Sequence, residues 1–135
     1  MNRLVFTLIL LLAGYVGQAQ PGVNPPPDPE KVVQRQLEAY NAQNMPAFLA
    51  TYADSIEIYR FPNKLTMQGK AALEKGYGDL FRKYPTNYAA LLGRIVQGNK
   101  VIDHERVTGR GSNTVQAVAI YEVQNGLIRR VWFVN

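Results

Sequence analysis

Three charged side chains, Arg94, Asp103 and Glu105, have the types and spacing that proton-transfer chemistry requires. A two-residue turn at Gly98-Asn99 between them would pair residue 94 with residue 103 and Leu92 with residue 105. Paired residues share one face of a hairpin, so the guanidinium should lie beside the Asp103 carboxyl, with Glu105 one step along. Burial and neighbouring charges separate the proton affinities of two such carboxyls. The cluster would therefore suit general acid–base catalysis near neutral pH.

The apolar neighbours of this cluster, Val96 and Val101 among them, favour a buried setting. The alternative is an ordinary ion pair at a solvated sheet edge, which would stabilise the fold by less than about 1 kcal/mol. Structural ion pairs also perturb pKa values, so the sequence leaves a catalytic and a structural role open.

His104 is the only histidine in the chain. It alternates with Asp103 and Glu105 along the expected strand and so should point to the opposite face, as a structural or interface residue. One histidine and no cysteine cannot form a multi-histidine or thiolate metal site. Phosphate-loop, dinucleotide and serine-elbow motifs are also missing from the sequence. We therefore expect no metal site and no cofactor.

The elements that must position these residues follow a simple order. Asp28-Pro29 is typical of a helix start, Pro46 opens a second helix, and residues 70–84 form a third that Pro85 ends. Strands are expected at residues 55–61, 87–97, 100–108, 114–124 and 127–134. This order predicts an α+β fold with three N-terminal helices packed on a strongly curved antiparallel sheet.

The pair Asn125-Gly126 predicts a second tight hairpin. The expected pairs are Gln124 with Leu127, Glu122 with Arg129, Ile120 with Val131, and Val118 with Phe133. We expect the face that carries Val118, Ile120 and Phe133 to contribute to a ligand cavity under the helices. The other face, with Trp132, is apolar too, which predicts a homodimer through the sheet. The alternative is that Trp132 lies in the core of a monomer.

Further candidate ligand contacts come from the first strand and the first helix. Glu57 and Tyr59 share a face of the strand and could reach a cavity mouth. Tyr40 is a candidate contact from the helix, although a buried tyrosine is more often a core residue with a hydrogen-bonded hydroxyl.

Residues 1–19 have the layout of a secretory signal peptide. A positive start at Arg3 precedes an apolar run over residues 4–13, and Gly17 and Ala19 are the small residues before a cleavage site. A membrane anchor is the alternative, but the run is shorter than the about 20 residues that span a bilayer. We therefore expect a periplasmic or secreted protein with no membrane attachment after cleavage.

Composition limits the remaining classes of function. The net charge is +5, but lysine and arginine are scattered from Lys31 to Arg130, so we expect no nucleic-acid partner. With no cysteine, an exported protein must hold its fold by core packing alone. The proline-rich residues 20–29 should form an extended leader, and residues 30–135 suffice for one domain.

Five segments in order resemble a known superfamily. They are Glu38–Asn44, Phe48–Asp54, Gly69–Leu73, Gly98–Glu105 and Asn125–Phe133. Together they are similar to SnoaL-like domains, which belong with nuclear transport factor 2 and the ketosteroid isomerases. The resemblance implies a cystatin-like cone, a pocket between helices and sheet, and in many members a dimer through the sheet. It does not imply one activity, because the superfamily contains enzymes and non-catalytic binders.

The resemblance can be tested residue by residue. The basic aspartate of ketosteroid isomerases would fall within Tyr59–Phe61, their first-helix tyrosine on Gln36, and their proton-sharing aspartate near Gln116. None of the three types is present, so ketosteroid isomerisation is not expected. The related epoxide hydrolases use an arginine between two aspartates, which the cluster at residues 94, 103 and 105 resembles in composition but not in spacing.

Three hypotheses follow. The first is an exported SnoaL-like protein that binds a small, partly apolar molecule and acts on it by isomerase- or hydrolase-like acid–base chemistry. The second is a non-catalytic dimeric module for ligand binding or interaction. The third is a protein whose pocket is filled by its own side chains and whose working surface is the sheet. Whether the protein is an enzyme stays open at this point.

Overall fold

The computed structural model describes residues 22 and 24–134. The expected signal peptide, residues 1–19, lies outside this part of the chain. The described residues of the leader have no regular structure up to Asp28, which caps the first helix. No helix within the described residues is both long enough and apolar enough to cross a membrane.

Three helices lie at the expected places: α1 (Pro29–Asn41), α2 (Met45–Leu49) and α3 (Lys70–Lys83). The Asp28 carboxylate accepts a hydrogen bond from the Glu30 amide at 3.0 Å, and the Asn44 side chain caps α2 in the same way. These caps satisfy amides that have no partner within their helices.

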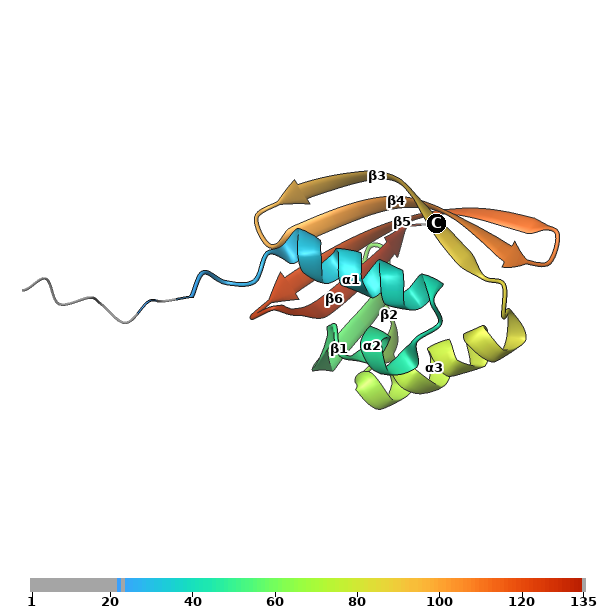
Figure 1. Cartoon of the computed structure of the whole chain (residues 1–135), viewed down its shortest axis with the longest axis horizontal. Helices are drawn as coiled ribbons and strands as arrows, with labels where there is room; N and C mark the ends of the chain where they lie inside the picture. Colours follow the sequence, from blue (N-terminus) through green and yellow to red (C-terminus); the bar gives the residue numbers. More distant parts are fainter. Residues whose placement is uncertain (1–21, 23, 135) are drawn as a thin grey trace, which may run out of the picture.

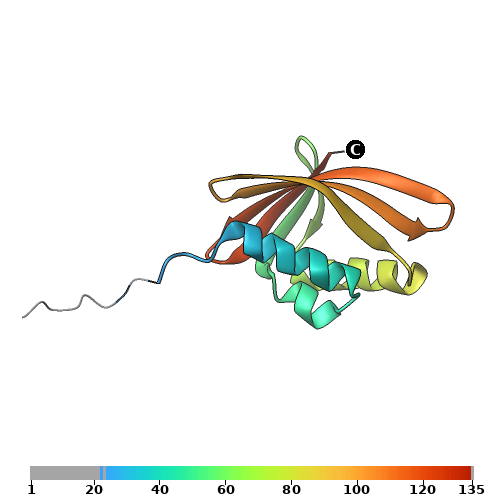
Figure 2. The ribbon, with the colours of Figure 1, turned by 45° about the horizontal axis from the view of Figure 1, so that its top comes forward.

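The sheet has six strands in the order β2-β1-β6-β5-β4-β3. Their bounds are β1 (Tyr52–Arg60), β2 (Lys64–Gln68), β3 (Tyr88–Gln97), β4 (Lys100–Arg110), β5 (Asn113–Gln124) and β6 (Leu127–Val134). The sheet arches over the helices, with α1 lying across its concave face (Figures 1 and 2). The expected α+β class, with three N-terminal helices on a curved sheet, is confirmed.

Two features of the sheet differ from the sequence-based expectation. Strand β2 is not among the strands predicted above; its five residues alternate polar and apolar, but the run is short and only Met67 is half-buried. Strands β1 and β6 pair in parallel, so the sheet is mixed rather than wholly antiparallel. Strand β1 also begins at Tyr52, three residues before the expected start at residue 55.

An aromatic cluster joins the helices to the sheet. Tyr40, Phe48, Tyr52, Tyr77 and Phe81 contact one another with ring centroids 4.8–6.3 Å apart, mostly in tilted or edge-on geometry. Such pairs contribute about 0.5–1.5 kcal/mol each beyond the area that they bury. This cluster fixes the height of α1 and α3 above the sheet.

The β3–β4 hairpin has the expected register near its turn. Arg94 pairs with Asp103, as predicted. A bulge then places Leu91, rather than the expected Leu92, opposite Glu105. Gly93 adjoins the bulge and has no side chain to resist the local bend.

The β5–β6 hairpin agrees with the expectation only next to its turn. Gln124 pairs with Leu127, but a bulge at Arg129 then shifts the register, so Glu122 pairs with Arg130. The expected pairs Glu122–Arg129, Ile120–Val131 and Val118–Phe133 are therefore wrong. Since a one-residue shift moves side chains to the other face, the shift has a direct effect on the candidate site. The concave, helix-covered face is called the inner face below, and the opposite one the outer face.

The end of β4 lies against the turn before β3, and this contact requires a glycine. Gly109 has φ +78°, and a Cβ on it would lie 1.9 Å from the Thr86 carbonyl oxygen. Gly111, in the next turn, has φ +70° and open space around it.

We expect Gly109→Ala to lower the free energy of unfolding by at least about 3 kcal/mol, because steric overlap with backbone adds to the strain of a positive φ. Gly111→Ala should carry only the backbone strain, about 1–2 kcal/mol. Urea unfolding of both variants measures the difference, and equal losses would contradict the proposed contact.

Candidate functional site

A cavity of about 450 Å³ lies between the helices and the inner face of the sheet. Two helices, α1 and α3, and five strands, β1, β2, β4, β5 and β6, contribute to its wall. The lining residues are Gln36, Leu37, Tyr40, Tyr59, Arg60, Thr66, Met67, Gly76, Tyr77, Leu80, Glu105, Val107, Arg110, Val115, Ala117, Tyr121 and Phe133. The cavity is of the size that small-molecule sites have, and the described side chains leave it open.

Glu105 is the only carboxyl among the lining residues. It is 6% exposed, on the inner face of β4. The pKa of Glu105 is raised to about 7, first by burial and second by the neighbouring Asp103 charge, while Arg94 opposes both effects. A carboxyl of this kind is divided between its acid and its base form near neutral pH, as a proton-transfer group requires.

The expected pairing of Arg94 with Asp103 is confirmed. The guanidinium donates from Nε to Oδ1 at 2.7 Å and from Nη2 to Oδ2 at 2.8 Å, and Nη1 donates to Gln34 Oε1 at 2.9 Å. Asp103 is completely buried, so the solvated-edge alternative does not describe this pair. Neither Arg94 nor Asp103 lines the cavity. Their effect on a bound molecule would therefore pass through Glu105.

Gln36 is a lining residue that the sequence-based search did not select. It is 5% exposed, and its Oε1 is buried without a hydrogen-bond donor among the described residues. A signal was present, because Gln36 lies at helical spacing from Val33 and Tyr40, within the apolar face of α1. A polar residue in such a face requires either an internal partner or a ligand.

Tyr40 and Phe133, two of the expected ligand contacts, line the cavity. Tyr77, Tyr121 and Arg110 join them, although the sequence-based search did not select these three as ligand contacts. They come from α3, β5 and the end of β4, which only the folded chain brings together.

The placement of Val118 and Ile120 in the cavity is corrected by the structure. The bulge in β6 pairs Ile120 with Trp132 and Val118 with Val134, which puts both side chains on the outer face. Phe133 reaches the inner face instead, opposite the buried Ala119.

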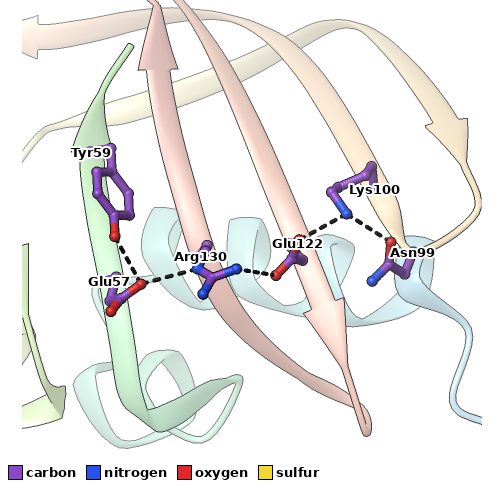
Figure 3. A network of polar contacts seen from close by, with 6 residues as sticks. All are labelled: Glu57, Tyr59, Asn99, Lys100, Glu122 and Arg130. Carbon is purple, nitrogen blue, oxygen red and sulfur yellow. Dashed lines mark hydrogen bonds and ion pairs between the residues drawn. The ribbon is translucent and has the colours of Figure 1, made fainter. Parts of the chain in front are cut away.

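Glu57 also lies on the outer face, away from the cavity. There it belongs to a polar network that crosses four strands, from Tyr59 through Glu57, Arg130 and Glu122 to Lys100 and Asn99 (Figure 3). Tyr59 contributes to the cavity wall, but its hydroxyl donates to Glu57 at 2.9 Å and its ring stacks on Trp132.

His104 lies on the outer face, as expected from its alternation with Asp103 and Glu105. It is exposed, and its Nε2 is 2.7 Å from Gln116 Oε1. Gln116, aligned above with the proton-sharing aspartate of the isomerases, is therefore directed away from the cavity. In the described part of the chain, no three side chains of His, Asp or Glu gather closely enough to hold a metal ion.

The raised pKa of Glu105 makes stability depend on pH. In the unfolded chain Glu105 loses its proton near pH 4.5, whereas the folded protein keeps it until about pH 7. The folded state binds more protons in this window, so its stability falls as pH rises from 4.5 to 7. At about 1.4 kcal/mol for each pH unit between the two values, the loss is roughly 3 kcal/mol.

We expect Glu105→Gln to remove this loss, so that the variant becomes more stable than the wild type above pH 7. Urea unfolding at several pH values measures it. Glu74→Gln, which changes an exposed carboxyl on α3, is the matched control and should keep the wild-type pH dependence. Parallel curves for Glu105→Gln and the wild type would show that Glu105 is not protonated near neutral pH.

Solved structures share this fold at low sequence identity. A cystatin-fold protein from Novosphingobium aromaticivorans has a TM-score of 0.75 at 23% identity, covering 80% of this chain and 98% of that one. A proposed polyketide cyclase from Sinorhizobium meliloti has a TM-score of 0.67 at 19% identity, covering 76% of this chain and 93% of that one. A proposed ketosteroid isomerase from Kribbella flavida has a TM-score of 0.67 at 18% identity, covering 78% of this chain and 76% of that one. At such identities the likeness establishes the fold alone.

A search of curated proteins finds no match. The family model described as a SnoaL-like domain matches residues 33–131. This interval extends from the first turns of α1 into β6 and includes Gln36, Glu105 and Arg110. The expected cystatin-like architecture is confirmed, and a solved structure described as nuclear transport factor 2-like shares the fold. The chain therefore belongs to the SnoaL-like domain family.

Proposed function

We propose that this protein binds a small, partly apolar molecule in its cavity and that Glu105 exchanges a proton with it. The observation that carries the proposal is a single buried carboxyl, with a pKa of about 7, that opens into a cavity of about 450 Å³. Cavities of this size with few polar groups are typical of small-molecule sites.

The walls of the cavity suit an apolar body with a few polar atoms. Leu37, Leu80 and Val107 supply apolar surface, while Glu105 and Gln36 supply polar atoms that have been taken out of water. A molecule that offered Gln36 Oε1 a donor would relieve its unmet hydrogen bond, which otherwise costs about 1–3 kcal/mol.

The proton chemistry of the site rests on Glu105 and on the groups around it. In its acid form Glu105 can donate to a carbonyl or ether oxygen, and in its base form it can remove an acidic C–H proton. Burial raises the pKa of the nearby Tyr52, Tyr77 and Tyr121 above their ordinary value, so their hydroxyls stay neutral. Asp103, paired with Arg94, acts as a positioning residue that favours the acid form of Glu105.

The relatives support this proposal only in outline. Two similar structures are named as a proposed polyketide cyclase and a proposed ketosteroid isomerase, and both activities concern small, partly apolar molecules. The isomerase carboxylates do not reappear at the corresponding positions here. The chemistry is therefore argued from Glu105 itself.

The test compares ligand retention by the wild-type protein with retention by a variant whose cavity is filled by a larger side chain. We expect the wild-type protein, incubated with a metabolite extract and re-isolated, to retain a small molecule that native mass spectrometry identifies. Ala117→Phe fills the cavity from its wall and should abolish retention. Thr114→Phe, which introduces the same phenylalanine at an exposed position of the same strand, is the control and should retain the molecule.

Retention by Ala117→Phe, or by none of the proteins, would refute ligand binding in the cavity. Any retained molecule that wild type converts provides the second readout. Glu105→Gln should then slow conversion by 10²–10⁴-fold, the usual range for a general acid or base. Equal rates in wild type and Glu105→Gln would leave a non-catalytic binding module.

We propose further that two copies pack through the outer faces of their sheets. Ile95 is 65% exposed there, next to the half-buried Ile102 and Ile120 and the half-buried Trp132. Apolar patches of this kind are uncommon on monomers. The pattern of residues 1–19 supports the separate proposal that the protein is exported, to the periplasm or out of the cell.

Ile95→Lys should convert the dimer to a monomer, because each copy would bury an unpaired lysine in the interface. Light scattering after gel filtration gives the mass. Val96→Lys is the matched control, since Val96 is the next residue of β3 but belongs to the other face and is also exposed. A wild-type protein that elutes as a monomer at all concentrations would refute the dimer.

A further inference from the structure

We infer that the bound molecule carries a carboxylate, or an equally compact planar anion, which Arg110 holds at the end of the cavity formed by the last residues of β4. This inference rests on the proposed function, because it concerns the same cavity. It adds a chemical class to the ligand, namely an acid with an apolar body.

Arg110 is held in place by neutral groups on two sides. Its Nε donates to Asn87 Oδ1 at 2.7 Å, and its Nη2 donates to Tyr40 Oη at 3.0 Å. A guanidinium has five N–H donors. Within the described residues Nη1 has no acceptor, and the side chain lines the cavity. The arginine is therefore positioned in advance with donors still available.

Two other arginines of the sheet have the carboxylate partners that Arg110 lacks. Arg94 makes a bidentate pair with Asp103, and Arg130 lies between Glu57 and Glu122. No carboxylate of the described chain lies within ion-pair distance of Arg110. A half-buried cation is stabilised by an anionic partner, and for this one the cavity is where a partner can enter.

The charges of the lining residues also favour an anionic ligand. The charged residues of the cavity wall are Arg60, Arg110 and Glu105, so cations outnumber the single carboxyl. Glu105 and Arg110 are five residues apart on one strand, at most roughly 16 Å at about 3.3 Å per residue. An elongated acid could therefore place its anion at Arg110 and its reactive end near Glu105.

A carboxylate fits this site better than a larger anion. Its two oxygens match the planar fork of a guanidinium, and such charge-assisted pairs are shorter and stronger than neutral hydrogen bonds. Gln36 supplies a separate recognition point, because its buried Oε1 has no donor and lines the same cavity. The ligand class that satisfies both is an apolar acid with a hydroxyl or N–H group further along its body.

The test uses acid and primary-amide pairs that differ only in charge: phenylacetate, naphthalene-1-acetate and decanoate against their amides. Isothermal titration calorimetry on the wild-type protein should show at least one acid binding ten times or more tightly than its amide. In Arg110→Gln the preference should fall to about one, while the affinity for the amide stays unchanged, which also shows that the variant is folded.

Arg60→Gln is the matched control, because it removes the other cation of the cavity wall and should keep most of the preference. Arg110→Lys keeps the charge without the planar fork and should give an intermediate preference, which covers the case in which Arg110→Gln does not fold. Amides that bind as tightly as acids, or a preference lost only in Arg60→Gln, would overturn the inference and leave the proposed function standing. Binding of no acid and no amide would overturn both.

Discussion

The buried pair between Arg94 and Asp103 is the interaction on which the candidate site depends. Removing two charges from water costs several kcal/mol, and the cost is offset here by a bidentate geometry and a third hydrogen bond to Gln34. The pair fixes the register of β3 on β4 and ties both to α1. It also places a negative charge behind Glu105, which together with burial keeps the pKa of that carboxyl near 7. Loss of either partner would disturb the fold and the proton affinity of Glu105 at once.

The two faces of one curved sheet have separate chemistry. On the outer face, Glu57, Arg130, Glu122 and Lys100 neutralise one another in a ladder across the strands (Figure 3). These pairs are partly exposed, so each contributes little to stability. On the inner face, charges are few, and the two cations of the cavity wall, Arg60 and Arg110, outnumber its one carboxyl, Glu105. Strand β4 carries Asp103, which is paired with Arg94, then Glu105 with its raised pKa, and then Arg110, which has no carboxylate partner within the described residues. The charged groups of the cavity therefore follow one another along this strand.

Membership of the SnoaL-like family explains the cavity but not its contents. A cone of helices on a curled sheet encloses space whatever residues line it, and related folds serve many functions. The residues that define this cavity are its own: Gln36 where the isomerases have a tyrosine, no carboxyl on the end of β1, and an arginine at the end of β4. The chemistry therefore has to be argued from these side chains.

Local physical chemistry allowed much of this structure to be predicted from the sequence. Asp28-Pro29 specifies the start of α1, and the pairs Gly98-Asn99 and Asn125-Gly126 specify two tight turns, so Arg94 and Asp103 were expected side by side. The bulges at Leu92 and Arg129 were not predictable, because the curl of the whole sheet decides where a strand takes an extra residue. The bulge at Arg129 puts Phe133 on the opposite face from Val118 and Ile120, so that of these three expected contacts only Phe133 lines the cavity. The meeting of Gln36, Arg110 and Glu105 was likewise decided by tertiary packing, because it joins residues up to 74 positions apart, which no local sequence pattern relates.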